Sequence, residues 1–182
     1  MQIISVINQK GGVGKTTTVI NLAAGLSQLN KKILVIDLDP QGNATTGLGL
    51  SNTDNSSDTI YGVLNGTKEI EGVIKNTQFQ NLDIVTSNVD LSGLEVETAD
   101  DSNRAFILKT KLTAYLNNSR GSYDYVLIDC PPSLSLLTVM ALVCSNSLLV
   151  PLQTEFFALE GLTQLMKTIE RIKISLNQDL KI

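Results

Sequence analysis

One short string of residues constrains the fold of this chain more than any other feature of its sequence. It lies between a β-rich apolar run at residues 3–7 and a helical pattern that starts near Lys15, and it reads Lys10-Gly11-Gly12-Val13-Gly14-Lys15-Thr16-Thr17. Glycines at such a place let backbone N–H groups converge on phosphate oxygens, and the N-terminus of the following helix adds further donors and partial positive charge. The string therefore predicts a phosphate-binding loop between a strand and a helix.

The side chains at the end of this string have separate predicted roles. Lys15 would bridge the β- and γ-phosphates of a nucleotide, Thr16 would place its hydroxyl on Mg²⁺, and Thr17 would bond the α-phosphate. The alternative is a glycine-rich strand-to-helix turn that carries an exposed lysine. The usual pattern also has glycine at position 9, where this chain has Gln9, and it lacks a second lysine such as Lys10.

The rest of the chain alternates between strand and helix patterns, which predicts the α/β class with a mostly parallel sheet and helices on both faces. We expect strands at 3–7, 33–37, 82–85, 125–129 and 148–151, and helices from near 15 and over 101–118, 134–143 and 159–176. The polar residues 51–58 predict a surface loop. A single P-loop domain is expected over residues 1–182. Residues 179–182 read either as a short edge strand or as the first residues of a strand in a chain cut short, and we favour the second interpretation.

The composition excludes several classes of protein. The 182 residues hold 18 Asp and Glu against 14 Lys and Arg, and this net charge of −4 argues against binding nucleic acid or anionic lipid through bulk charge. The lack of His excludes His-based triads and His-ligated metal sites. Cys130 and Cys144 are too few for a disulfide framework and lack the flanks of an iron–sulfur motif, so two buried thiols are expected. The sequence shows neither a spanning helix nor a signal peptide, which predicts a cytoplasmic protein.

Two predicted strands end in acidic residues, and ligands of parallel sheets lie beyond the carboxyl ends of the strands. Four apolar residues precede Asp129, which predicts that this carboxylate holds Mg²⁺ directly or through water. The alternative is an N-cap of the following helix. Asp37 and Asp39 lie at the end of the other strand. We expect Asp37 to point to the opposite side from Asp39, as a contact of the phosphate loop or of a residue that touches it.

These motifs resemble those of the ParA/Soj family of chromosome and plasmid partition ATPases, which carry a deviant Walker A loop. The signature K-G-G-V-G-K-T-T is matched at every position, residues 37–43 match the family's D-x-D-P-Q-G-N string, and residues 129–133 match its switch II. Further likeness lies at Gly47-Leu48-Gly49 and at residues 155–162, so the resemblance covers essentially all of the chain. We expect the family's C-terminal part to be missing, with its last strands, much of the adenine pocket and most basic DNA-contacting residues.

The resemblance also implies roles for single residues. Lys10 would reach across a dimer interface to the phosphates of the partner's nucleotide, whereas the alternative is a lysine that neutralises its own nucleotide. Asp39 would orient or polarise the attacking water. The loops that respond to the γ-phosphate would include Pro40, Gln41, Gly42, Asn43 and, in switch II, Pro131.

The function implied is that of a Mg²⁺-dependent ATPase that acts as a nucleotide-gated dimer switch in DNA segregation. ATP would hold two copies together, the dimer of the complete protein would bind non-specific DNA at the nucleoid, and the partner would be a ParB/Spo0J-like centromere-binding protein, with no membrane involved. One alternative is a membrane-associated positioning ATPase of the MinD type, although the Asp-Pro-Gln-Gly-Asn string speaks against it. Another is a short nucleotide-binding remnant without turnover.

Overall fold

The chain is built around one six-stranded sheet. A computed structural model describes residues 1–51, 56–118, 123–154 and 158–182. The strands lie in the order β3-β4-β2-β5-β1-β6, and only the β3–β4 pair is antiparallel. Their bounds are β1 (Gln2–Val6), β2 (Ile33–Asp37), β3 (Ile74–Asn76), β4 (Leu82–Val85), β5 (Tyr125–Asp129) and β6 (Ser147–Leu149). The parallel strands therefore bring their carboxyl ends to one edge of the sheet.

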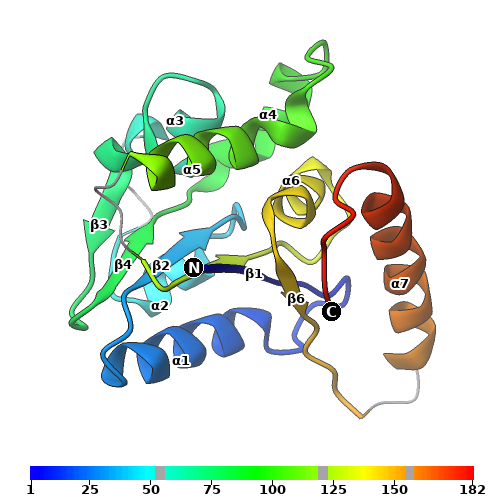
Figure 1. Cartoon of the computed structure of the whole chain (residues 1–182), viewed down its shortest axis with the longest axis horizontal. Coiled ribbons are helices and arrows are strands. Elements are labelled where there is room, and N and C mark those ends of the chain that lie inside the picture. Colours follow the sequence, from blue (N-terminus) through cyan, green and yellow to red (C-terminus); the bar gives the residue numbers. More distant parts are fainter. Residues whose placement is uncertain (52–55, 119–122, 155–157) are drawn as a thin grey trace.

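Helices cover both faces of this sheet, as Figure 1 shows with α1 on one side and α5 and α6 on the other. The α-helices are α1 (Lys15–Gln28), α2 (Asn43–Gly47), α3 (Ile60–Leu64), α4 (Leu94–Glu97), α5 (Ile107–Asn117), α6 (Leu136–Cys144) and α7 (Ala158–Ser175). Short 3₁₀ helices are η1 (Ser56–Asp58), η2 (Ile70–Val73), η3 (Val89–Gly93) and η4 (Arg104–Phe106).

The side chains of the central strands alternate between the two faces, which explains why these strands read as continuous apolar runs. In β2, Ile33 and Val35 pack with α1, whereas Leu34 and Ile36 pack with α5 and α6. All five residues of β2 are buried. The central strands are therefore covered on both faces, and their carboxyl ends are left as the place for polar chemistry.

The predicted α/β class is confirmed, and the predicted strands 33–37, 82–85 and 125–129 have the bounds of β2, β4 and β5. Sequence patterns missed β3, α2, α3 and α4, and the helix expected over 101–118 begins only at Ile107, after η4. Of the expected loop 51–58, residues 52–55 lie outside the described residues, and 56–58 form η1. Residues 155–157, part of one resembling segment, also lie outside them.

Near the end of the chain, Lys181 forms one parallel bridge with Ser147 of β6. The Leu148 N–H donates to the Lys181 carbonyl at 2.8 Å, and the Lys181 N–H donates to the Asn146 carbonyl at 3.0 Å. The strand pattern at 179–182 is thus present as a single residue pair beside β6.

In the described part of the chain, no helix is both long and apolar enough to cross a membrane. Both cysteines are free and buried, as expected.

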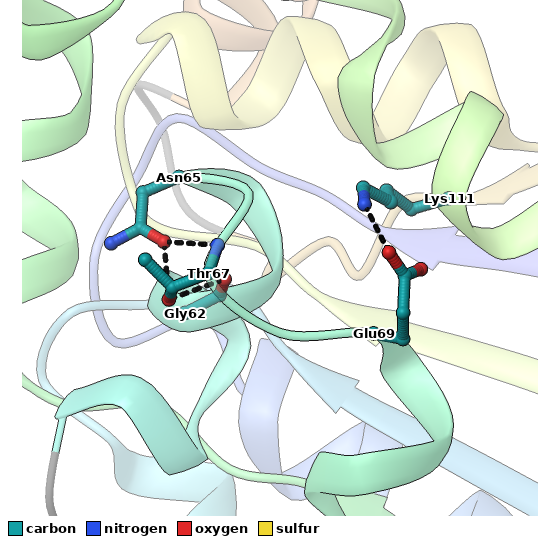
Figure 2. Close-up of polar contacts among 5 residues, drawn as sticks. All are labelled: Gly62, Asn65, Thr67, Glu69 and Lys111. Atoms are coloured by element: carbon teal, nitrogen blue, oxygen red, sulfur yellow. Dashed lines mark hydrogen bonds and ion pairs between the residues drawn. The ribbon is translucent and has the colours of Figure 1, made fainter.

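Polar contacts fix the segment that follows α3 (Figure 2). The Thr67 hydroxyl lies 3.1 Å from the Gly62 carbonyl and 2.7 Å from Asn65 Oδ1, which also accepts the Thr67 N–H at 3.0 Å. Lys111 of α5 pairs with Glu69 at 2.7 Å. The pair of Lys111 and Glu69 ties α5 to a segment far from it in the sequence.

A buried amide joins the ends of α6 and α7. Asn177 Nδ2 donates to the carbonyls of Leu142 (2.8 Å), Val143 (3.3 Å) and Ser145 (2.8 Å) at the end of α6. The last carbonyls of a helix have no partner within the helix, so this side chain satisfies groups that would otherwise be buried without one. Its role is to fix α7 against α6 beside the sheet.

We expect Asn177→Ala to lower the free energy of unfolding by about 1–3 kcal/mol, because it leaves buried carbonyl groups without a donor. Chemical denaturation followed by circular dichroism measures this change. Gln178→Ala is the matched control, since Gln178 is exposed, and its effect should stay within about 0.5 kcal/mol. Equal effects of the two substitutions would contradict the role given to Asn177.

Candidate functional site

The predicted loop residues and Asp39 line one cavity. The cavity has a volume of about 410 Å³ and is lined by Gly11, Gly12, Gly14, Lys15, Thr16, Thr17, Asp39, Asn43 and Pro132. The loop connects β1 to α1, whereas Asp39 follows β2 and Pro132 follows β5. Neighbouring parallel strands bring these segments together, because their carboxyl ends share one edge.

Glycine is required at two positions of the loop by its backbone. Gly12 has φ 75° and Gly14 has φ 89°, both in the left-handed region that side chains with a Cβ disfavour. A Cβ placed on Gly11, Gly12 or Gly14 would meet no other atom within 4 Å, so these residues face open space. The loop therefore presents backbone to the cavity, as a phosphate cradle requires.

The helix that follows this loop begins without a side-chain cap. Gly14 is the N-cap of α1, and the first turn contains no acidic residue. The first N–H groups of a helix have no partner within the helix, and they carry partial positive charge. The cavity therefore lies at an uncapped helix start, where an anion is favoured.

The lysines of the loop have different surroundings. Lys15 is only 7% exposed, and its Nζ donates to the Lys10 carbonyl at 3.3 Å, which folds the ammonium back over the loop. The Lys10 side chain is exposed, and its backbone N–H donates to Asn8 Oδ1 at 3.0 Å. The predicted turn with an exposed lysine at position 15 is therefore wrong. Val13 is buried and anchors the loop through its side chain.

A segment that sequence analysis did not single out supports this loop from the side of β6. Asn8 Nδ2 donates to the Pro151 carbonyl at 2.8 Å, and Gln153 Nε2 donates to the Gly12 carbonyl at 3.0 Å. Both bonds depend on β6 lying next to β1, a neighbour relation that no local motif encodes. The residues after β6 thus hold the phosphate loop in place.

The two carboxylates at the end of β2 diverge. Alternation within a strand would place residues two apart on the same side, but β2 ends at Asp37 and Asp39 lies beyond it. Asp39 is 6% exposed and lines the cavity, and its Oδ1 accepts the Gln41 N–H at 2.9 Å. Asp37 is fully buried, and its hydrogen bonds in the described structure go to Thr45 and to the Asp39 N–H. The Asp37 carboxylate therefore holds α2 and not the phosphate loop.

Burial raises the pKa of Asp37 to about 6, although hydrogen bonds from Thr45 oppose the rise.

The residues of the predicted γ-phosphate loop lie between Asp39 and the start of α2. Pro40 is half-buried, Gln41 and Asn43 are exposed, and Gly42 is buried with φ 63° as the N-cap of α2. Of these residues, Asn43 lines the cavity together with Asp39.

Asp129 ends β5 in full burial. Both of its carboxylate oxygens are buried with no hydrogen-bond partner among the described residues. The predicted alternative, an N-cap of the next helix, is wrong because α6 begins at Leu136 with Ser135 as its N-cap. Pro131, which follows β5, is buried, and Pro132 lines the cavity.

The pKa of Asp129 rises to about 7, chiefly because burial disfavours the charged carboxylate. The nearby Thr16 hydroxyl and the positive charge of Lys15 oppose this rise of the pKa. The Thr16 hydroxyl does not form a hydrogen bond of normal geometry with the carboxylate. Nearby Asp37 reinforces the rise through its negative charge. A buried carboxylate without a donor fits a cation, and hard oxygen ligands suit Mg²⁺.

The protein alone supplies only part of a metal site. Among the described residues, no group of three or more Asp, Glu, Cys or His side chains is placed to hold a metal ion. Mg²⁺ commonly keeps several waters and binds through one or two carboxylates plus phosphate oxygens. The pair of Thr16 and Asp129 fits such a partial site, which a phosphate ligand would complete.

We expect the stability of the protein without nucleotide and metal to depend on Asp129. Its folded pKa of about 7 lies above the value of about 3.9 for an unfolded Asp, so the folded state binds more protons between these values. The free energy of unfolding therefore falls as pH rises from about 4 to about 7. Asp129→Asn removes this loss and should stabilise the protein at pH 8 by roughly 1–4 kcal/mol, with no gain near pH 4.

Denaturant unfolding across this pH range in EDTA tests this expectation. Asp179→Asn is the control, because it removes the same charge at an exposed position, and it should leave the pH dependence close to that of the wild type. An Asp129→Asn protein with the wild-type pH profile would show that the burial of this carboxylate carries no free-energy cost.

The complete chain, residues 1–182, matches the AAA domain family. It is 48% identical to the chromosome partitioning protein ParA of Caulobacter vibrioides over 182 residues, which are 100% of this chain and 67% of that protein. It is 45% identical to the sporulation initiation inhibitor protein Soj of Bacillus subtilis over 181 residues, or 100% of this chain and 70% of that protein. The chain thus spans about two thirds of the length of these relatives.

Solved structures share the same fold. Cobyrinic acid a,c-diamide synthase from Mycobacterium smegmatis with bound ADP and magnesium is similar with a TM-score of 0.92 and 36% identity, over 100% of this chain and 71% of that chain. A plasmid partition protein from Borrelia burgdorferi gives a TM-score of 0.81 and 32% identity, over 100% of this chain and 76% of that chain. With the whole-length family match and the ParA and Soj relatives, these likenesses establish that the chain belongs to the ParA/Soj family of P-loop ATPases with a deviant Walker A loop.

Proposed function

We propose that this protein binds Mg²⁺ and ATP, hydrolyses ATP, and acts as a dimer switch in chromosome or plasmid partitioning. The observation that carries the proposal is the cavity that joins the glycine loop and Lys15 to the Asp39 carboxylate. The names of the ParA and Soj relatives, and the ADP and magnesium bound in the synthase structure, support the substrate and the process.

The loop residues 10–17 would bind the phosphates of ATP. Backbone N–H groups of the glycines and of the first turn of α1 would donate to phosphate oxygens, and Thr17 would bond the α-phosphate. The Lys15 ammonium, which donates only to the Lys10 carbonyl among the bonds described above, would turn to the β- and γ-phosphates. Thr16 and Asp129 would hold Mg²⁺, which supplies positive charge that offsets the charge of the phosphates.

Asp39 would orient the water that attacks the γ-phosphorus. As the new P–O bond forms, the bond between the γ-phosphorus and the bridging oxygen breaks, and ADP and inorganic phosphate leave. The N–H of Gln41 holds the Asp39 carboxylate in the cavity wall at 2.9 Å. Phosphoryl transfer needs accurate placement of groups more than covalent help, so a carboxylate fixed in this way suits the role.

Dimerisation would depend on the exposed Lys10. In the proposed dimer, the Lys10 ammonium of each copy reaches the phosphates of its partner's nucleotide, so ATP joins the copies and hydrolysis releases them. The ATP-bound homodimer would bind non-specific DNA and a ParB-like centromere-binding protein. Because the chain spans about two thirds of its relatives, DNA binding is proposed for the complete protein.

We expect the protein to bind Mg²⁺-ATP, and Lys15→Ala to weaken this binding. Loss of charge-assisted bonds worth about 1.5–3 kcal/mol corresponds to roughly a 10- to 100-fold weaker affinity. Isothermal titration calorimetry measures the ATP affinity of both proteins.

Lys31→Ala is the matched control for this experiment, because Lys31 is exposed and precedes β2 at the opposite edge of the sheet. It should leave ATP affinity unchanged. Failure of the wild-type protein to bind ATP, or equal binding by the wild type and Lys15→Ala, would sink the proposed nucleotide site.

A second expectation concerns the dimer. Sedimentation in Mg²⁺-ATP should show a shift of the wild type toward the dimer, whereas Lys10→Ala should bind ATP and sediment as a monomer. Removal of a charge that faces the partner's phosphates costs the dimer its charge-assisted contact. If Lys10→Ala dimerises as the wild type does, Lys10 neutralises its own nucleotide and the trans role is wrong.

A further inference from the structure

One polar junction lies behind the cavity and joins three segments of the chain. At its centre is Thr45, in α2. Asp37 Oδ2 accepts the Thr45 N–H at 2.8 Å and the Thr45 hydroxyl at 2.7 Å. The same hydroxyl accepts the Ser87 N–H at 3.0 Å. Thr45 is therefore bonded both to the end of β2 and to the residues that follow β4.

This junction is closed to water. Asp37, Thr45 and Ser87 are each 0% exposed. A buried hydrogen bond to a carboxylate is stronger than one between neutral groups, and a buried partner left without it carries a cost. The Thr45 hydroxyl uses its proton for Asp37 and a lone pair for Ser87, so no other natural side chain except Ser repeats both bonds.

The other side of α2 packs against the helix that follows the phosphate loop. Ala44 and Leu48 share a buried cluster with Val19 and Ala23 of α1. The helix α2 is thus held by apolar contact with α1 on one side and by the Thr45 hydroxyl on the other. Removal of the hydroxyl takes away one of the two bonds to Asp37 and the bond to Ser87, and it leaves the backbone N–H of residue 45 as the remaining donor from α2 to Asp37.

The residues that line the cavity lie between the two fixed points Asp37 and Thr45. Gly42 N–H donates to the Asp39 carbonyl at 2.9 Å, and Gln41 N–H donates to the Asp39 carboxylate at 2.9 Å. This turn runs directly into α2, so its place in the cavity follows the register of that helix. The position of the Asp39 carboxylate therefore depends on the bonds that Thr45 makes.

We propose that Thr45 is a positioning residue for hydrolysis, which sets the Asp39 carboxylate through the Asp37–Thr45–Ser87 junction. Thr45 does not line the cavity and acts through Asp39. The proposal rests on the proposed ATPase function. In this proposal Thr45 affects the position of Asp39, whereas residues 10–17 bind the phosphates.

The test compares Thr45→Val, which keeps the shape and loses the hydroxyl, with Thr45→Ser, which keeps the hydroxyl. Thr45→Val should lower kcat for ATP hydrolysis roughly 10- to 100-fold, with ATP affinity close to that of the wild type. Thr45→Ser should restore most of kcat. A merely structural role would lower the melting temperature and leave the kcat of the folded protein unchanged, and Thr45→Ala serves if Thr45→Val does not fold.

The neighbouring Thr46 provides the matched control. Its side chain is exposed, and its hydroxyl lies within the same turn, 3.2 Å from the Gly42 carbonyl and 3.3 Å from the Asn43 carbonyl. Thr46→Val should leave kcat unchanged. A folded Thr45→Val or Thr45→Ala protein with wild-type kcat, or a Thr45→Ser protein as slow as Thr45→Val, would overturn the proposal.

Hydrogen exchange in the protein without nucleotide gives a readout that does not depend on activity. The Gln41 and Gly42 amides, which donate to Asp39, should exchange faster in Thr45→Val than in Thr45→Ser or the wild type. Unchanged exchange would overturn the positioning role even if ATP is hydrolysed. A wild-type protein that neither binds nor hydrolyses ATP would instead overturn the proposed function, and the exchange rates would still decide the role of Thr45.

Discussion

The concentration of negative charge at one edge of the sheet constrains the rest of the site. Asp37 and Asp129 are fully buried at the ends of the paired strands β2 and β5, and the charge of Asp37 contributes to the raised pKa of Asp129. Asp37 has donors from Thr45 that offset part of its burial. Asp129 has no such donor in the described structure. The site is therefore arranged to favour a cation next to Asp129 more than next to Asp37.

Much of this arrangement follows from local sequence signals. The glycine loop could be placed because the positive φ angles of Gly12 and Gly14 and the following helix are encoded within a few residues. The divergence of Asp37 and Asp39 does not follow from strand alternation, which places residues two apart on the same side; it arises because β2 ends at Asp37. The strands β2, β4 and β5 were bounded correctly because they are short, largely apolar segments ended by polar residues.

The parts that sequence analysis missed depend on neighbours that are distant in the sequence. Thr45 stands in a polar run that contains no apolar period, and only the packing of β4 beside β2 brings Ser87 to its hydroxyl. The support of Gly12 by Gln153 likewise requires β6 to lie beside β1. The strand β3, only Ile74–Asn76, is too short for a periodic signal. Tertiary neighbours, and not local propensity, decided these features.

The two supports act on opposite sides of the cavity, and they differ in strength. On the β4 side, the contacts of Thr45 are fully buried and include a carboxylate. A rearrangement there would leave the buried Asp37 carboxylate without its hydrogen-bond donors from Thr45, which carries a free-energy cost. On the β6 side, the Gln153 side chain is exposed and its bond to Gly12 exchanges readily with water. A ligand that binds the backbone of the phosphate loop can therefore displace the bond from the β6 side at a smaller free-energy cost. The water-orienting carboxylate Asp39 is held from the stiffer side, which suits a group whose role is placement.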